Sequence, residues 1–171
     1  MKRAILTSAL LFAAIITLSA QSIIGQWKTI VDNDGEKINV VMNFAKDGKF
    51  TLAMSQSIKS PEIGELQLLI NMPGTYKMKD AKNMVVNLET NKTDVKFDIK
   101  FSKALEDAFK QQPEKKEEFI KLMNDGVVEK TKEEFIKEPI LNGNMAIKSL
   151  TATTLVVEPE DDDELTLTRV K

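Results

Sequence analysis

The feature that most constrains this chain is an apolar–polar alternation with a period of two residues, repeated in short segments from Gly25 to Leu88. In "DVKFDIKF" at 94–101, apolar side chains alternate strictly with charged ones. Successive side chains of a β-strand point to opposite faces, so this spacing predicts strands with one buried face. The alternation recurs near both ends of the chain, in "WKTIV" at 27–31 and "LTLTR" at 165–169.

Short turn signals separate these segments. "DNDG" at 32–35 and "KDGK" at 46–49 place Asp-Gly between alternating runs, which is a strong hairpin signal. "MPG", "KDAKN", "TNKT" and "PEDDDE" punctuate the rest of the chain. About eight to ten short antiparallel strands in sequence order form a meander, and its closure into a barrel removes the edge strands. We therefore expect a mainly β chain with an antiparallel up-and-down β-barrel; a β-sandwich is the alternative fold.

One region, residues 102–138, breaks this period and adopts helical spacing instead. Apolar residues recur at helical intervals at 105–109 and at 119–123. Pro113 suits the first turn of a helix, and Gly126 suits its C-terminal end. We expect a helical insertion between two late strands. It is either a plug that covers one barrel end or a mobile lid, and we favour the plug.

The N-terminal residues have the layout of a secretory signal peptide. A basic "MKR" precedes an uncharged apolar run that ends at Ala20, and cleavage after Ala20 or after Ser22 would fit. A retained membrane anchor is the alternative, although the run is short for a membrane span. We expect a signal peptide at 1–20 and a soluble mature domain at 21–171. The mature protein would be exported to the periplasm or the extracellular space, with no stable membrane span.

Composition narrows the function classes. Removal of residues 1–20 leaves 22 basic residues against 26 acidic ones, a net charge of −4, and the two signs are interspersed, so nucleic-acid binding is not expected. The chain has no cysteine for disulfides and no histidine, the commonest metal ligand and general base. "PEDDDEL" at 159–165 clusters carboxylates but lacks the spaced ligands and glycine of a calcium loop. We expect a monomer that is not an enzyme, with no catalytic residue, metal or cofactor.

Four segments, "GQWKTIV", "FAKDGKFTL", "MPGTYKMK" and the terminal "LTLTRV", together resemble the lipocalin-like barrels exported by bacteria. These belong to the calycin group, which includes lipocalins and fatty-acid-binding proteins. The resemblance covers most of the mature chain except the helical insertion. In that group a first-strand tryptophan packs inside one barrel end and a late arginine lies across its ring. The matching residues here are Trp27, the single tryptophan, and Arg169, the single arginine after Arg3.

The residues favour this contact independently of the resemblance. Trp27 shares a strand face with Thr29 and Val31, and Arg169 shares one with Leu165, so both side chains are expected to point inward. A planar guanidinium stacks on an indole as an ammonium cannot, which contributes ~0.5–2 kcal/mol. First and last strands are neighbours when a barrel closes, so the pair would be a structural clasp. In the fatty-acid-binding relatives a late arginine holds a ligand carboxylate, which is the alternative role.

Several methionines fall within the predicted strands. Methionine is flexible and polarizable and adapts to varied apolar partners, although ordinary core filling is the alternative explanation. An eight-stranded barrel is just wide enough either to be filled by side chains or to hold one small ligand. The predicted ligand-binding residues are Met42, Phe44, Leu52, Met54, Tyr76, Met78, Met84, Phe97 and Arg169. The insertion would close the pocket through Phe109, Phe119, Ile120 or Met123.

The sequence therefore predicts a small-molecule carrier or sensor that binds an apolar or amphipathic ligand in its barrel. The alternative is a non-enzymatic cell-envelope or surface interaction module whose barrel is filled by its own side chains.

Overall fold

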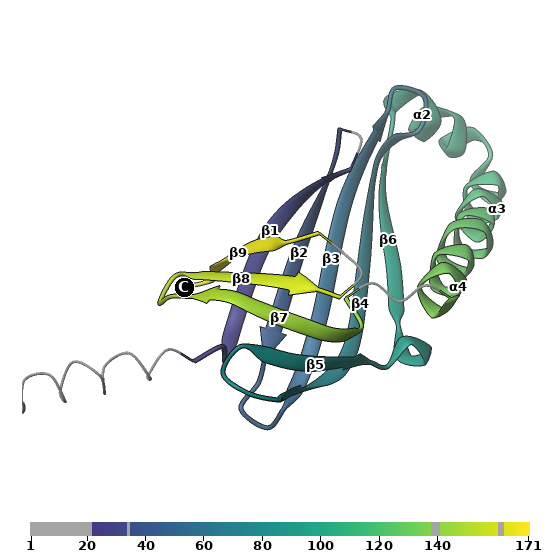
Figure 1. Cartoon of the computed structure of the whole chain (residues 1–171). Helices are drawn as coiled ribbons and strands as arrows, with labels where there is room; N and C mark the ends of the chain where they lie inside the picture. Colours follow the sequence, from purple (N-terminus) through teal and green to yellow (C-terminus); the bar gives the residue numbers. More distant parts are fainter. Residues whose placement is uncertain (1–21, 34, 138–140, 161–162) are drawn as a thin grey trace, which may run out of the picture.

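The computed structural model describes residues 22–33, 35–137, 141–160 and 163–171. The predicted signal peptide and the cleavage point after Ala20 lie outside these residues. Nine strands carry the fold (Figure 1): β1 (Gly25–Asn33), β2 (Glu36–Phe44), β3 (Lys49–Ser60), β4 (Gly64–Met78), β5 (Asn83–Leu88), β6 (Asp94–Phe101), β7 (Gly143–Leu150), β8 (Thr154–Pro159) and β9 (Leu165–Arg169).

Eight of the strands form a closed antiparallel ring. Hydrogen-bonded pairing runs from β1 through β2, β3, β4, β5, β7, β8 and β9 and returns to β1. The hairpins predicted from the two Asp-Gly turns join β1 to β2 and β2 to β3. The prediction of an up-and-down barrel is confirmed, and the β-sandwich alternative is excluded because the first and last strands pair with each other.

The remaining strand, β6, leaves the ring. One edge of β4 pairs with β3, and its other edge is divided between β5, opposite Gly74–Met78, and β6, opposite Gly64–Asn71. β5 and β6 are thus two halves of one strand, separated by the short 3-10 helix η1 (Thr90–Lys92). The interruption lies beside Pro73, which has no N–H to donate to a ladder. Since β7 pairs with β5 and not with β6, the sheet β1–β2–β3–β4–β6 extends beyond the closed ring (Figure 1).

The predicted helical insertion is confirmed within residues 103–137. It comprises α2 (Lys103–Gln111), α3 (Pro113–Met123), the π-helical segment η2 (Asn124–Val128) and α4 (Glu129–Lys137). Ser102 caps α2, because its hydroxyl oxygen accepts a hydrogen bond from the backbone N–H of Leu105. Pro113 begins α3 as expected, but Gly126 does not end a helix. It lies inside η2, where the wider turn lets the chain continue into α4.

The core fills the closed ring. The inward-facing side chains of the strands are fully enclosed there, and they include Trp27, Met42, Phe44, Phe50, Leu52, Met72, Met84, Val86, Leu155, Val157 and Leu167. Full burial of each such side chain favours folding by about 1.5–3 kcal/mol. Helices α2 and α3 contain no buried residue and lie beside β6, outside the ring (Figure 1). None of the described helices is long and apolar enough to cross a membrane.

Candidate functional site

Trp27 and Arg169 meet where the first and last strands join. The two residues are directly opposite in the β1–β9 register, and the guanidinium carbon lies 4.1 Å from the centroid of the indole ring. Nη1 of Arg169 donates to the carbonyl of Ile24 at 2.9 Å, and Nη2 donates to that of Ser22 at 2.6 Å. The indole Nε1 donates to the carbonyl of Ile23 at 2.7 Å. The guanidinium group of Arg169 therefore contacts both the indole ring of Trp27 and the backbone that precedes β1.

Gly25 makes this arrangement possible. Its φ of +128° is one that residues with a side chain rarely adopt, and a Cβ at this position would lie 2.9 Å from Nη1 of Arg169. The glycine of the Gly-x-Trp pattern thus leaves room for the guanidinium. Two nitrogens of Arg169 donate to backbone carbonyls at the closed end, and the residue does not line the groove described below.

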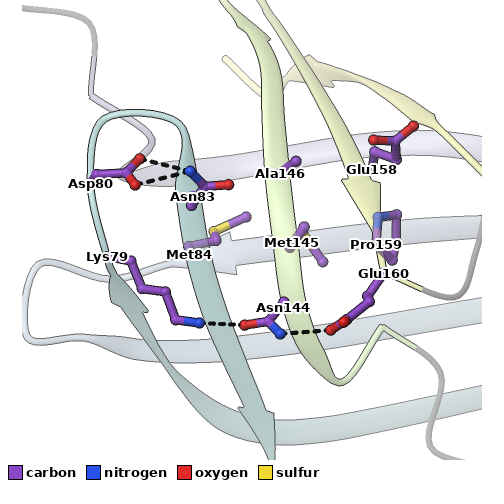
Figure 2. A pocket seen from close by; sticks show the side chains of 10 residues that line it. All are labelled: Lys79, Asp80, Asn83, Met84, Asn144, Met145, Ala146, Glu158, Pro159 and Glu160. Atoms are coloured by element: carbon purple, nitrogen blue, oxygen red, sulfur yellow. Dashed lines mark hydrogen bonds between the residues drawn. The ribbon is translucent and has the colours of Figure 1, made fainter.

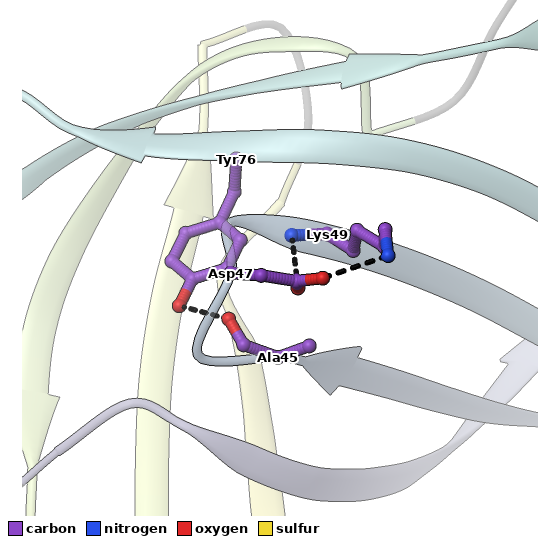
Figure 3. Close-up of polar contacts among 4 residues, drawn as sticks. All are labelled: Ala45, Asp47, Lys49 and Tyr76. Carbon is purple, nitrogen blue, oxygen red and sulfur yellow. Dashed lines mark hydrogen bonds and ion pairs between the residues drawn. The ribbon is translucent and has the colours of Figure 1, made fainter.

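The β2–β3 turn completes the closed end (Figure 3). The Tyr76 hydroxyl donates to the carbonyl of Ala45 at 2.9 Å, and the Tyr76 ring stands edge-on to Phe44 with centroids 5.1 Å apart. Burial, and then the charge of Asp47, raise the pKa of Tyr76 above its ordinary value. The side chain of Lys49 donates to Asp47 at 2.7 Å and, with the Lys49 backbone N–H, lowers the pKa of that carboxyl. Tyr76 therefore anchors a turn.

Where the closed ring gives way to the extended sheet, the inner face of the strands is hollowed, in part beneath α4. Two adjoining hollows share Ile38 and Met54, and we name them together the mouth groove. The first measures about 400 Å³ and is lined by Ile38, Met54, Ser55, Gln56, Leu68, Ile70, Thr131, Glu134 and Phe135. The second measures about 250 Å³ and is lined by Val31, Ile38, Val40, Met54, Leu141, Asp163 and Leu165. Their combined size and largely apolar lining are those of small-molecule sites.

Four of the predicted ligand-binding residues lie in the core instead. Met42, Phe44, Leu52 and Met84 have no exposed surface and pack against other strand side chains inside the ring. Phe44 contacts Phe50 with ring centroids 4.9 Å apart. These positions follow the predicted inward alternation, but the ring is narrow enough for side chains to fill it.

The other five predicted residues are spread over the molecule. Met54 lines both hollows of the mouth groove. Phe97 lines a separate hollow between β6 and α3. Met78 is 37% exposed at the end of β4, while Tyr76 and Arg169 lie at the closed end as described above. Of the predicted set, Met54 alone reaches the groove.

The helices meet the sheet differently from the expectation. Phe109 and Phe119 pack on Phe101 at the far end of β6. The ring centroid of Phe101 lies 5.0 Å from that of Phe109 and 5.8 Å from that of Phe119. Ile120 lines the hollow beside β6. α4 covers the groove, through Phe135 among other residues. Phe135 falls within the helical insertion predicted at 102–138, but local spacing does not show which face of the sheet lies opposite it.

A further hollow of about 440 Å³ lies over β5, β7 and β8 (Figure 2). Its polar side chains bind one another: Lys79 donates to Asn144 at 2.5 Å, and Asn144 donates to Glu160 at 2.6 Å. Asp80 accepts two hydrogen bonds from Asn83. Because these groups already have partners, a ligand would have to replace contacts as well as form them. The mouth groove is therefore the stronger candidate site.

No model of a known protein family matches the chain, and no characterised protein shows significant sequence similarity to it. What the structure establishes is a class: a closed, antiparallel, eight-stranded β-barrel with a helical insertion, an architecture consistent with a calycin or lipocalin-like fold.

Proposed function

We propose that this protein is an exported, lipocalin-like binding protein that holds a small apolar or amphipathic ligand in the mouth groove. The observation that carries the proposal is the partly open apolar lining beside a core whose side chains are fully enclosed. Ile38, Leu68 and Phe135 are only half-buried although they pack against core residues. A ligand that covered them would remove apolar surface from water, at roughly 25 cal/mol per Å².

The site differs from the barrel interior expected from the sequence. A ligand inside the ring would have to displace side chains such as Phe44 and Leu52, which are fully enclosed. Protein interiors are close-packed, so displacement of these enclosed side chains would lower the stability of the barrel. At the mouth, by contrast, a ligand would occupy existing space between the sheet and α4.

The remaining parts of the proposal have separate support. Export is supported by the N-terminal signal-peptide pattern, and the lipocalin-like assignment by the sequence resemblance together with the barrel architecture. Binding without catalysis is supported by the lining itself. Among its described residues, no hydroxyl is hydrogen-bonded to a general base.

The test is titration of the mature protein with N-phenyl-1-naphthylamine, a neutral apolar fluorophore. We expect saturable fluorescence enhancement and a negative heat-capacity change of binding. Ile38→Trp, which enlarges a residue shared by both hollows, should weaken binding by about tenfold or more. The matched control is Ile30→Trp on the outer face of β1, where Ile30 is 61% exposed, and it should bind normally. Unchanged binding by a folded Ile38→Trp variant would contradict the proposal.

The filled core specifically favours the second candidate, a non-enzymatic cell-envelope or surface interaction module. Mass spectrometry of organic extracts from the natively purified protein separates the two. A stoichiometric small molecule supports the binding protein. No extracted molecule, together with no fluorophore binding, supports the interaction module.

A further inference from the structure

The charged residues that line the mouth groove are all acidic. Glu134 of α4 lines the larger hollow, and Asp163, shortly before β9, lines the smaller one. Gln56 is also in the lining, and its side-chain amide donates to the carboxylate of Glu36. Among the described residues of the lining, none is basic. A ligand in the groove therefore meets negative charge at two places.

Several nearby cationic groups, although not Lys130 of α4, are engaged elsewhere. On α4, Lys132 pairs with Glu129 at 3.2 Å and Lys137 pairs with Glu133 at 3.7 Å. Lys116 of α3 lies 5.5 Å over the Phe101 ring, at the separate hollow beside β6. Arg169 is held at the closed end by backbone carbonyls.

By contrast, the carboxylates of Glu134 and Asp163 form no ion pair within the described part of the chain. Both side chains are exposed, so their field reaches the openings of the groove through water. An anionic head group would be repelled there, whereas a cationic one would be attracted.

We infer that the groove takes an amphipath with a cationic head group, whose apolar chain covers Ile38, Met54 and Leu68 and whose ammonium lies near Glu134 or Asp163. This inference rests on the proposed function. It predicts weaker binding of a fatty-acid-type carboxylate, because the described lining contains acidic groups and no cation to pair with it.

The experiment compares three ligands built on a twelve-carbon chain: dodecyltrimethylammonium, dodecanol and dodecanoate, each below its aggregation concentration. Each competes with the neutral fluorophore on the mature protein. We expect the ammonium compound to bind most tightly and the carboxylate most weakly, with about tenfold between them. The preference should shrink as ionic strength rises, because exposed charges are screened.

Glu134→Gln/Asp163→Asn is the informative double variant. It should remove the preference for ammonium and leave the affinity for dodecanol unchanged. The matched control is Glu114→Gln/Glu117→Gln, which changes the net charge equally on exposed positions of α3 outside the groove lining and should retain the preference.

The outcomes distinguish failure of the cationic specificity from failure of the proposed binding function. If neither the fluorophore nor any dodecyl compound binds, the proposed function fails. If the fluorophore binds and Ile38→Trp blocks it, but dodecanol or dodecanoate binds as tightly as the ammonium compound, the cationic specificity is wrong while the binding function stands. A preference that survives in Glu134→Gln/Asp163→Asn also overturns the inference.

Discussion

The closed part of the barrel and its mouth are built from the same long strands, yet they differ in how their inner faces are covered. In β2, Met42 is fully enclosed whereas Ile38 is half-buried. In β3, Leu52 is fully enclosed whereas Ile58 is 38% exposed. All four side chains follow one alternation. The comparison shows that the alternation determines which face of a strand is apolar. Closure of the ring determines whether that face is buried in a core that excludes water.

The difference between the closed part and the mouth originates in the strand pairing of β4. Where β5 lies against β4, β7 pairs with β5 and the ring closes; where β6 lies against β4, no described strand pairs with the other edge of β6. The helices cover the resulting opening only in part. A region that is partly covered is suited to binding, because it keeps apolar surface that a ligand can still bury.

The largest expected effect compares the same substitution in the two regions. Phe44→Ala should lower the free energy of unfolding by about 3–5 kcal/mol, because it removes a fully enclosed ring. Phe119→Ala should lower it by only about 1 kcal/mol, because Phe119 is half-buried and its aromatic contacts are with Phe101 and Phe109. Denaturant unfolding measures both values. Equal losses would mean that the helices are as integral to the fold as the core.

The next effect concerns the clasp at the closed end. Arg169→Lys keeps the charge but loses the stacked plane and part of the hydrogen bonding, so we expect a loss of about 2 kcal/mol. Gly25→Ala should cost about 1–3 kcal/mol because of its φ and the approach of Nη1. Lys28→Arg, on the exposed face of β1, is the control and should be near neutral.

The two clasp substitutions should also be coupled. Gly25→Ala should cost less in an Arg169→Ala background, because the crowded Nη1 is then gone and only the backbone strain remains. A double-mutant cycle by thermal unfolding tests this. Strict additivity, or an unchanged melting temperature for Arg169→Lys, would show that the contact does not stabilise the barrel.

A smaller expected effect concerns local unfolding, which exposes backbone amides to solvent at different rates in the two regions. Helices α2 and α3 contain no buried side chain, so their amides should exchange with solvent well before those of the paired strands β1, β2 and β3. Hydrogen exchange followed by mass spectrometry measures this order. A groove ligand should slow exchange in α4 and leave α2 unaffected. Uniform exchange through the whole chain would remove the distinction between the two regions.

The smallest effect is confined to the turn at the closed end. Tyr76 is the single tyrosine of the chain, so phenolate absorbance reports this one group. Its titration midpoint should lie above 10.0, because burial and the Asp47 charge raise its pKa. Asp47→Asn should lower the midpoint but not restore the ordinary value, since burial is the larger cause.

The sign of the pH effect on stability follows from this shift. The folded-state pKa of Tyr76 lies above that of the unfolded chain, so the contribution of the neutral phenol is complete below about pH 10 and is lost as pH rises through the folded-state pKa. Phe is the matched replacement: Tyr76→Phe should remove this alkaline dependence. Persistence of the dependence in Tyr76→Phe would assign it to other groups.

Much of the fold could be predicted from the sequence because its signals are local. Alternation over 94–101, the Asp-Gly hairpins and the switch to helical spacing after Phe101 depend on neighbouring residues only. The end of the helix at Gly126 was predicted wrongly for the same reason, since a local signal cannot show that a π turn will accommodate the glycine. The candidate site was largely missed, because Met42 and Met54 have the same pattern in sequence but different surroundings.

By itself, then, the sequence determined which faces of the strands are apolar, where the turns fall and that one segment is helical, because each of these follows from side-chain spacing and turn chemistry. Only the tertiary structure decided that β6 leaves the ring, that the core fills the closed part and that α4 meets Ile38 and Leu68 across an open groove. These outcomes depend on which distant strands exchange hydrogen bonds. That pairing sets the burial of every inward side chain, and no local pattern encodes it.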